Sequence, residues 1–456
     1  MKTRIVAVLA ILTLPILSFG QSSLSFPRVL QPQDFSTTGF AIVNPASAPA
    51  SVLFTVYDVK GQPQYSTSQT VPAGGQYSRL ASEIFPGAAV SGWVEATSET
   101  SGLHGFFFAG DLTTYADGAE AAPSSQEVVL PLISPQSEIH IANTGSSDIT
   151  VLLNLLGLDG FDLAIPYPQH IPAKGFFKGD MASVFALEDL SLPSHMRITC
   201  KCPGASTVAA TVIARDLIAR PSWAVRNGEP AAGTATTIYF PHTVEGFQGT
   251  SDWRSLLGLT NLSSTTANDV AITFVPESGG PGQTRIQRLP PNGGLRFPTR
   301  DLFTVSPGFQ NGWMRVSSTN GQPLTGYIAY ADVIAAGVAV VPPQQDPQPS
   351  LTFAHIADLP PWLTGLALLN TNTATANVEV LARNPNGSPI GSVSFPLGPG
   401  ASTARLLREL VPQTQSRTSD GGFVVVRSDL PIFGIELFFS RDLRVLANVP
   451  GAATVP

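Results

Sequence analysis

The sequence predicts an all-β protein, a tandem array of four antiparallel β-sandwich modules that each carry one short helical segment. The first reason is a pattern that occurs four times: a strand, a turn of Gly, Ser or Pro, and a second strand that ends at Asp. The copies are GWVEATSETSGLHGFFFAGD, SHMRITCKCPGASTVAATVIARD, GWMRVSSTNGQPLTGYIAYAD and GGFVVVRSDLPIFGIELFFSRD, at 92–111, 194–216, 312–332 and 421–442. The second reason is composition, because 41 Gly and 40 Pro in a chain with 43% hydrophobic and 12% charged residues indicate short strands, frequent turns and packed cores. The third is length, since 456 residues are enough for about three to four domains.

Each copy is preceded by the same elements in the same order. An apolar strand ends at Asn, and the next strand alternates apolar and polar residues, as in TGFAIVNPASAPASVLFTVYDVKG at 38–61. A Pro/Gly turn follows, and then a segment of about two helical turns that is too short to be stable without packing. These helical segments are SRLASEIF, GDMASVFAL, PTRDLFTV and ARLLRELV. A β-propeller is the main alternative, but propeller blades repeat about every 40–50 residues, less than half the spacing of these copies.

The order of the repeats predicts the boundaries of the domains. We expect a signal peptide at 1–20 and modules at 21–125, 126–232, 233–346 and 347–456, with linkers at 117–126, 226–236 and 342–350. Lys2 and Arg4 precede an apolar run that is short for a membrane span and contains Pro15. The mature chain is therefore expected to be exported without a transmembrane segment, to the extracellular space, the cell surface or the periplasm.

Composition and motifs argue against several functional classes. The formal net charge is −7 with dispersed Lys and Arg, whereas binding to nucleic acid needs clustered positive charge. The sequence has no nucleophile elbow, phosphate-binding loop or dinucleotide fingerprint, and its six His residues lack the short spacing of a zinc site. We therefore expect no enzyme activity, no cofactor and no metal.

Asn and Asp recur at the turns of every copy. They could be acid pairs or calcium ligands, but Asn and Asp at turns commonly hydrogen-bond their own backbone, which explains identical placement in each repeat. We interpret them as structural anchors: Asn44, Asn143, Asn261, Asn370, Asp111, Asp216, Asp332 and Asp442.

Cys200 and Cys202 are the two cysteines of the chain. Cys200 aligns with Ser in the other copies, which favours an inert, packed thiol. A local or intermolecular disulfide in an oxidising compartment is the alternative. His195 takes the position of Trp93 and Trp313, so we expect it to be a packed ring rather than a ligand.

Four residues are candidates for ligand binding. Trp253 and Trp362 lie in equivalent loops of the third and fourth modules, where an exposed indole offers an apolar face to a sugar. The alternative is that each indole packs over the core of its own module. His242 and His355 share one position in the opening strands of the same two modules.

Three consecutive Phe residues at 106–108 predict a strand that is apolar on both faces. Since successive side chains of a strand point to opposite faces, one face is expected to pack on a neighbouring module.

Four motifs carry a resemblance to a known type of repeat: the F-P-H or F-A-H opening, the apolar-Asn-Thr/Pro turn, the P-x-G-G turn and the G-W-x-x-V pattern. They resemble the immunoglobulin-like β-sandwich repeats of secreted bacterial surface proteins, especially an uncharacterised repeat of soil bacteria. This resemblance covers nearly all of the mature chain and brings no assigned catalytic residue. The function expected is a non-catalytic exported scaffold for extracellular binding or adhesion, with extracellular polysaccharides or surface proteins as candidate partners. The alternative is an array of carbohydrate-binding modules that uses the loop tryptophans.

Overall fold

The computed structural model describes residues 21–185, 193–202, 204, 206–277, 279–304, 308–417 and 421–454. The expected signal peptide at 1–20 lies outside the described residues. Antiparallel strands make up most of the described chain, with a few helices of about one turn. The all-β class predicted from the sequence is confirmed.

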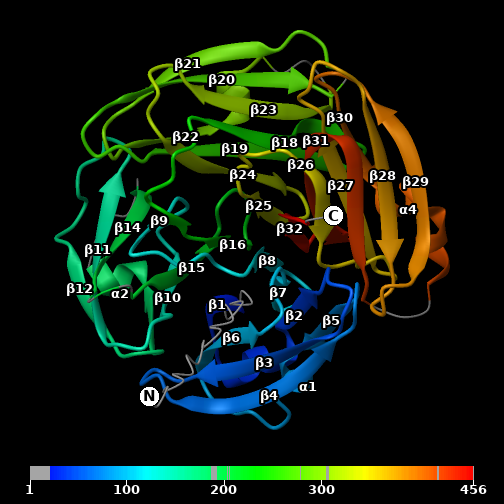
Figure 1. The fold of residues 1–456 in the computed structure, drawn as a ribbon. Helices are drawn as coiled ribbons and strands as arrows, with labels where there is room; N and C mark the ends of the chain where they lie inside the picture. Colours follow the sequence, from blue (N-terminus) through cyan, green and yellow to red (C-terminus); the bar gives the residue numbers. More distant parts are fainter. Residues whose placement is uncertain are drawn as a thin grey trace, which may run out of the picture.

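The first module consists of two antiparallel sheets that face each other across a core. We call the sheet toward the rim of the molecule the outer sheet and the other the inner sheet (Figure 1). The outer sheet contains, in spatial order, β1 (Ser22–Leu30), β6 (Gly92–Ser98), β3 (Ala50–Tyr57) and β4 (Pro63–Val71). The inner sheet contains β5 (Gln76–Leu80), β2 (Gly39–Val43), β7 (His104–Gly110) and β8 (Ala116–Glu120).

The other modules repeat this order of strands. The second module has β9 (Glu127–Leu130), β14 (Pro193–Lys201), β11 (Ile149–Gly157) and β12 (Tyr167–Ile171) outside, with β17 (Glu229–Pro230) beside β9, and β13 (Phe176–Asp180), β10 (Glu138–Asn143), β15 (Val208–Arg215) and β16 (Trp223–Asn227) inside. The third has β18 (Thr237–Gln248), β23 (Gln310–Ser318), β20 (Asn268–Pro276) and β21 (Gln283–Leu289) outside, and β22 (Gly294–Pro298), β19 (Ser251–Asn261), β24 (Leu324–Asp332) and β25 (Val338–Val341) inside. The fourth has β26 (Gln348–Phe353), β31 (Phe423–Ser440), β28 (Ala376–Arg383) and β29 (Pro389–Leu397) outside, and β30 (Ser402–Leu406), β27 (Trp362–Leu369), the end of β31 and β32 (Leu446–Ala453) inside.

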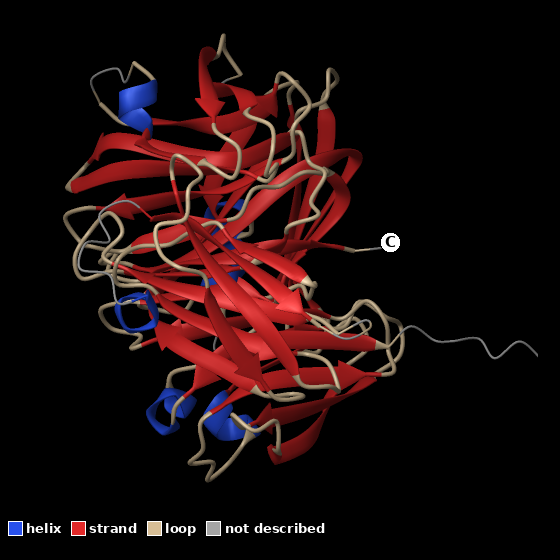
Figure 2. Cartoon of the chain, turned by 90° about the vertical axis from the view of Figure 1, so that its left-hand side faces the viewer, coloured by secondary structure: helices blue, strands red, loops and turns tan. Residues whose placement is uncertain are grey.

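A one-turn α-helix follows the first strand of each inner sheet, within the segments predicted to be helical. These are α1 (Ala81–Ile84), α2 (Met181–Phe185), α3 (Thr299–Leu302) and α4 (Leu407–Leu410); η1 (Pro32–Ser36) and η2 (Pro412–Ser416) are 3-10 turns. Such short helices depend on packing, and each buries its first residue, as Ala81 and Leu407 show. In the side view, the helices gather toward one side of a thick body of strands (Figure 2).

The four modules close into a ring (Figure 1). The first and fourth modules are in contact, and the last strands of the four inner sheets, β8, β16, β25 and β32, meet around the central axis. The segment at 117–126, which we expected to be a linker, therefore begins inside β8 at the centre of the ring, with Asp117 fully buried. The repeats close into a ring as the blades of a β-propeller do, but each repeat is a two-sheet sandwich rather than a single sheet.

Each inner sheet is buried on both faces because it also covers the preceding module. Phe107 lies in the core of the first module, whereas Phe106 and Phe108 pack into the core of the fourth. In the same way, Trp223 of the second module packs on the first and Tyr327 of the third packs on the second. Ile435 of the fourth packs on the third. The prediction of a two-sided apolar strand at 106–108 is confirmed, and the neighbour that it contacts is the last module in the sequence.

Polar contacts repeat at the interfaces. Nε1 of Trp93 donates to the carbonyl oxygen of Lys174 at 2.7 Å, and Nε1 of Trp313 donates to that of Gly400 at 3.0 Å, so each indole binds the Pro/Gly turn of the following module. The ring closes through Gln76, whose Nε2 donates to the carbonyl oxygen of Gly422 and whose Oε1 accepts from the backbone N–H of the same residue.

Asp117 joins all four modules at the axis. Its carboxylate accepts backbone N–H groups from Gly118 at 2.8 Å, Val225 at 2.8 Å and Asn448 at 3.2 Å, and it also accepts the N–H of Val340. Burial raises the pKa of the Asp117 carboxyl, while these donors act in the opposite direction. One side chain therefore ties the four central strands to one another.

Candidate ligand-binding pocket between two modules

The candidate site is a pocket of about 440 Å³ between the third and fourth modules. One wall comes from β18, β19 and β24 of the third module, and the other comes from the inner sheet of the fourth. Its size lies in the range of ordinary small-molecule sites.

Aromatic rings form the wall that belongs to the third module. His242 packs edge-on against Tyr330, with ring centroids 5.8 Å apart and an interplanar angle of 84°. Trp253 lines the same pocket, and its buried Nε1 has no hydrogen-bond partner among the residues that the structure describes. Phe439 adds a ring from the fourth module. The pocket therefore offers the apolar faces of several aromatic rings.

The pocket exists because small side chains of the fourth module face it. Gly365 pairs with Leu437 there, at the positions that Gly39 and Phe108 occupy in the first module. Where the first module packs on the fourth, the ring of Phe108 lies in the interface, and its centroid is 4.8 Å from the ring centroid of Phe438. Leucine is shorter than phenylalanine, so the equivalent space in front of Tyr330 stays open.

The polar groups of the pocket include a neutral imidazole. Burial lowers the pKa of His242 to about 4, so its ring is uncharged at neutral pH and can donate from one nitrogen and accept at the other. The other polar lining residues are Gln248, Ser251, Asn311, Arg405 and Glu409. Apolar rings with a few convergent polar groups are typical of a small-molecule site.

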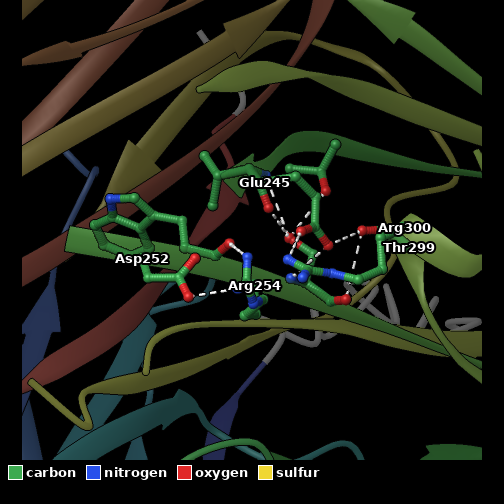
Figure 3. Close-up of polar contacts among 9 residues, drawn as sticks. Glu245, Asp252, Arg254, Thr299 and Arg300 are labelled. Carbon is green, nitrogen blue, oxygen red and sulfur yellow. Dashed lines mark hydrogen bonds and ion pairs between the residues drawn. The ribbon is translucent and has the colours of Figure 1, made fainter. Parts of the chain in front are cut away.

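A buried carboxylate fixes the strands of this wall (Figure 3). Glu245 of β18 accepts from the backbone N–H of Ser255 at 3.0 Å, from Nη2 of Arg300 at 2.6 Å and from Oγ1 of Thr299. Arg254 donates to the carboxylate of Asp252, which joins the two residues that flank Trp253 in the sequence. The bonds of Glu245 tie β18 and β19 to α3 and so fix the strand that carries Trp253.

The other two candidate residues lie in a different interface. Ring centroids of His355 and Trp362 lie 5.3 and 6.0 Å from that of Phe438, and His355 also stacks on Phe106 of the first module. Burial and, to a smaller extent, the charge of Arg417 lower the pKa of His355 to about 4. The structure thus brings the four candidates together as two equivalent pairs, of which the pair His242 and Trp253 lines the 440 Å³ pocket.

The four Asn side chains are buried and bind the turns of their own modules. Nδ2 of Asn44 donates to the carbonyl oxygens of Ala48 at 2.8 Å and Pro72 at 3.1 Å, while its Oδ1 accepts the N–H of Ala46. Equivalent bonds are made by Asn143, Asn261 and Asn370.

The four Asp residues accept backbone N–H groups in the turns that follow them. Asp111 accepts from the hydroxyl of Thr114 and from the backbone N–H groups of Thr113, Thr114 and Tyr115, and these bonds outweigh burial and lower the pKa of its carboxyl to about 2. Asp216 accepts the N–H of Ser222. Asp332 and Asp442 make similar bonds to Ile334 and Arg444.

The cysteines differ from the interpretation as inert thiols. Cys200 and Cys202 form a disulfide at the end of β14, with Cα atoms 5.1 Å apart. This is the local disulfide that we considered the weaker alternative. His195 is fully buried, and burial lowers its pKa to about 3.

Neither a metal site nor a membrane helix is seen in the described ranges. No three His, Cys, Asp or Glu side chains there are grouped so that they could hold a metal ion. None of the helices in the same residues has the length and apolar character needed to cross a bilayer.

Comparisons with known proteins give no family. No family model and no curated protein matches the sequence. Among solved structures, the tetra-tandem repeat in the extending region of a large adhesion protein aligns with 12% identity and a TM-score of 0.12, over 96% of this chain and 100% of that one. A glycoside hydrolase of family 32 from Bifidobacterium adolescentis aligns with 11% identity and a TM-score of 0.15, over 94% and 96%. These TM-scores carry no argument about fold or function, so what is shown is the all-β sandwich repeat itself.

Proposed function

We propose that this protein is a non-catalytic exported scaffold for extracellular binding, in which the ring holds a ligand between its third and fourth modules. The observation that supports this proposal is the pocket of about 440 Å³ beside Trp253, His242 and Tyr330. The wall of the pocket is anchored by Glu245, and both modules are fixed in the ring, so the site is preorganised. An immunoglobulin-like family relationship and an adhesive role belong to the same proposal.

The second candidate function is recognition of a carbohydrate. Trp253 supports it, because an indole face beside amide and charged groups suits a sugar with an apolar C–H face and polar hydroxyls. Trp362 supports it less, since its ring packs against Phe438. The carbohydrate hypothesis therefore concerns one pocket and no longer an array of equivalent modules.

The test is a titration of the mature chain, residues 21–456, with oligosaccharides of plant, fungal and bacterial polysaccharides, followed by tryptophan fluorescence. A saturable response is expected, and Trp253→Ala should weaken binding by about tenfold or more, because loss of one ring contact removes about 0.5–1.5 kcal/mol together with apolar area. Trp362→Ala is the matched control, because it removes the equivalent indole outside the pocket and should leave the affinity unchanged.

Two outcomes would contradict these proposals. A flat response from folded protein would exclude the carbohydrate ligands, and an equal effect of both tryptophan variants would exclude the pocket as the site. Appearance of shortened oligosaccharides on prolonged incubation would overturn the non-catalytic assignment.

A further inference from the structure

A second cavity, of about 370 Å³, lies where the modules meet at the ring axis. Its lining includes Glu120 at the end of β8, Arg226 of β16 and Asn448 of β32, together with Pro342, which follows β25. All four central strands or their ends therefore contribute to one cavity, which the closed ring creates and a linear array would lack.

The charges in this axial cavity do not balance. Arg226 donates to one carboxylate oxygen of Glu229, and Thr325 donates to the other. Burial raises the pKa of the Glu120 carboxyl and the nearby charge of Glu229 adds to this rise, whereas Arg226, which is already bound to Glu229, and the N–H of Glu120 act in the opposite direction. Two carboxylates thus share one guanidinium. His104 does not compensate, because burial lowers its pKa and keeps it neutral.

An acceptor and two apolar side chains complete the site. Asn448 is only 2% exposed, and its Oδ1 has no hydrogen-bond partner in the described part of the chain. Phe106 and Ile435 line the cavity with apolar surface. An unbalanced carboxylate and an unsatisfied amide oxygen need donors, and an aromatic ring attracts positive charge.

We propose that the axial cavity binds a small organic cation, an ammonium group on an apolar body. The ammonium donates to the carboxylate of Glu120 and to the amide oxygen of Asn448, and the body lies against Phe106 and Ile435. Ile435 lines both this cavity and the pocket at Trp253, but the two share no other lining residue, and the proposed cation site does not depend on Trp253.

The test uses three probes that share one body and differ in charge: benzylammonium, benzyl alcohol and benzoate. Calorimetric titration of the mature chain at neutral pH should give binding of benzylammonium that is about tenfold or more tighter than that of benzyl alcohol, with benzoate weakest. Glu120→Gln keeps the shape but removes the charge, so it should abolish the preference for the cation. Glu99→Gln, at an exposed position, is the matched control and should keep it.

Equal binding of the three probes, no binding of benzylammonium, or a preference that survives Glu120→Gln would each overturn the proposal. If Glu120→Gln does not fold, the relative affinities of the three probes for the unmodified chain still test whether the cavity prefers a cation. Trp253→Ala separates the two sites, because it should leave the binding of benzylammonium unchanged; a loss would place the cation in the other pocket and contradict the axial site.

Discussion

At the scale of single residues, Glu436 is the least expected side chain of the fourth module. It occupies the position of Phe107, Val212 and Ile328, four residues before the Asn anchor on the paired strand, and it is fully buried. Both of its carboxylate oxygens lack a hydrogen-bond partner among the described residues. Burial, with a contribution from Asp358, raises the pKa of Glu436 well above its usual range, so the folded protein keeps this carboxyl protonated to a higher pH than the unfolded chain does.

This makes stability depend on pH. In the unfolded chain a Glu side chain has a pKa of about 4.3. Between that value and the raised pKa of the folded state, the unfolded chain has released a proton that the folded chain keeps, so the free energy of unfolding falls as pH rises. Glu436→Leu should remove this fall and increase the free energy of unfolding by about 1–3 kcal/mol, since an unpaired buried polar group costs about that much. Urea unfolding from pH 5 to pH 8 measures both effects.

Glu99→Leu is the control for Glu436→Leu, because Glu99 is exposed and should change neither the stability nor its pH dependence. A lower stability of Glu436→Leu at every pH would show that the carboxyl has a favourable partner in the folded core.

Some of the residues that line the pocket could be predicted from the sequence, and others could not. Trp253 and His242 were found because an indole and an imidazole are chemically distinctive, but the expectation that Trp253 lies in a loop was wrong, since it lies within β19 and pairs with Asp332. Gly365 and Leu437 were missed, because an inner-sheet residue of ordinary apolar type gives no sign that it faces another module. Tyr330 was missed for the same reason, since it lies within a continuous apolar strand.

At the scale of elements, the hairpin turn between β3 and β4 packs against the second module through Gly61. Gly61 has a φ of +76°, and a Cβ atom there would lie 1.7 Å from the carbonyl oxygen of Ala173. Gly160 of the second module makes the equivalent contact with the third, since a Cβ atom there would lie 1.9 Å from the carbonyl oxygen of Pro291. These contacts explain why each of these two turns ends in Gly, because a side chain would separate the modules.

Gly61→Ala should therefore destabilise the protein by more than the usual cost of Ala at positive φ, which is about 1 kcal/mol. Gly321→Ala is a matched control, because Gly321 has the same φ of +76° but no atom within 4 Å of its Cβ position. Thermal unfolding of the two variants separates the cost of the clash from the cost of the backbone conformation. Equal losses would mean that the turn does not hold the interface.

The sequence predicted most elements and misjudged the ends of the inner sheets. Alternation identified the outer strands, since one face of each is solvated, and the helical segments were recognised by their leucines and phenylalanines. The segment at 117–126 was expected to be a linker because it precedes the opening strand of the second module. In the structure its first residues belong to β8, which contacts β16 and β32 at the axis. Gly118 serves close packing within the inner sheet, because a Cβ atom there would lie 2.4 Å from the carbonyl oxygen of Phe107.

At the scale of the whole molecule, the ring should unfold as one unit. Asp117 binds the N–H groups of Val225, Val340 and Asn448, one from each of the other modules. Asp117→Ala leaves these donors unsatisfied at about 1–3 kcal/mol each, so the free energy of unfolding should fall by at least about 3 kcal/mol. Urea unfolding should show one transition for the unmodified chain and separate transitions for the variant.

Asp111→Ala removes an acidic anchor from a turn outside the axis and serves as the comparison for Asp117→Ala. It should cost about 1 kcal/mol and preserve the single transition. A single unchanged transition in Asp117→Ala would show that the apolar interfaces alone couple the modules.

Closure of the ring was beyond sequence reasoning. A strand that is apolar on both faces, such as 106–108, indicates that another module packs on it. Its hydrophobic residues do not indicate which module this is, and the structure shows that it is the fourth. Gln76 binds residues 278 and 346 positions away.

This closure has a consequence for biosynthesis. A ribosome makes the first module long before the last, and until the last module emerges, the outward face of β7, with Phe106 and Phe108, has nothing to cover it. Folding of the nascent chain must proceed with this apolar strand exposed, and the final assembly step joins segments at the greatest sequence separation, which makes it slow. A helper that shields the first module during this delay, or a translation rate fast enough to shorten it, would determine how much of the protein reaches the closed form.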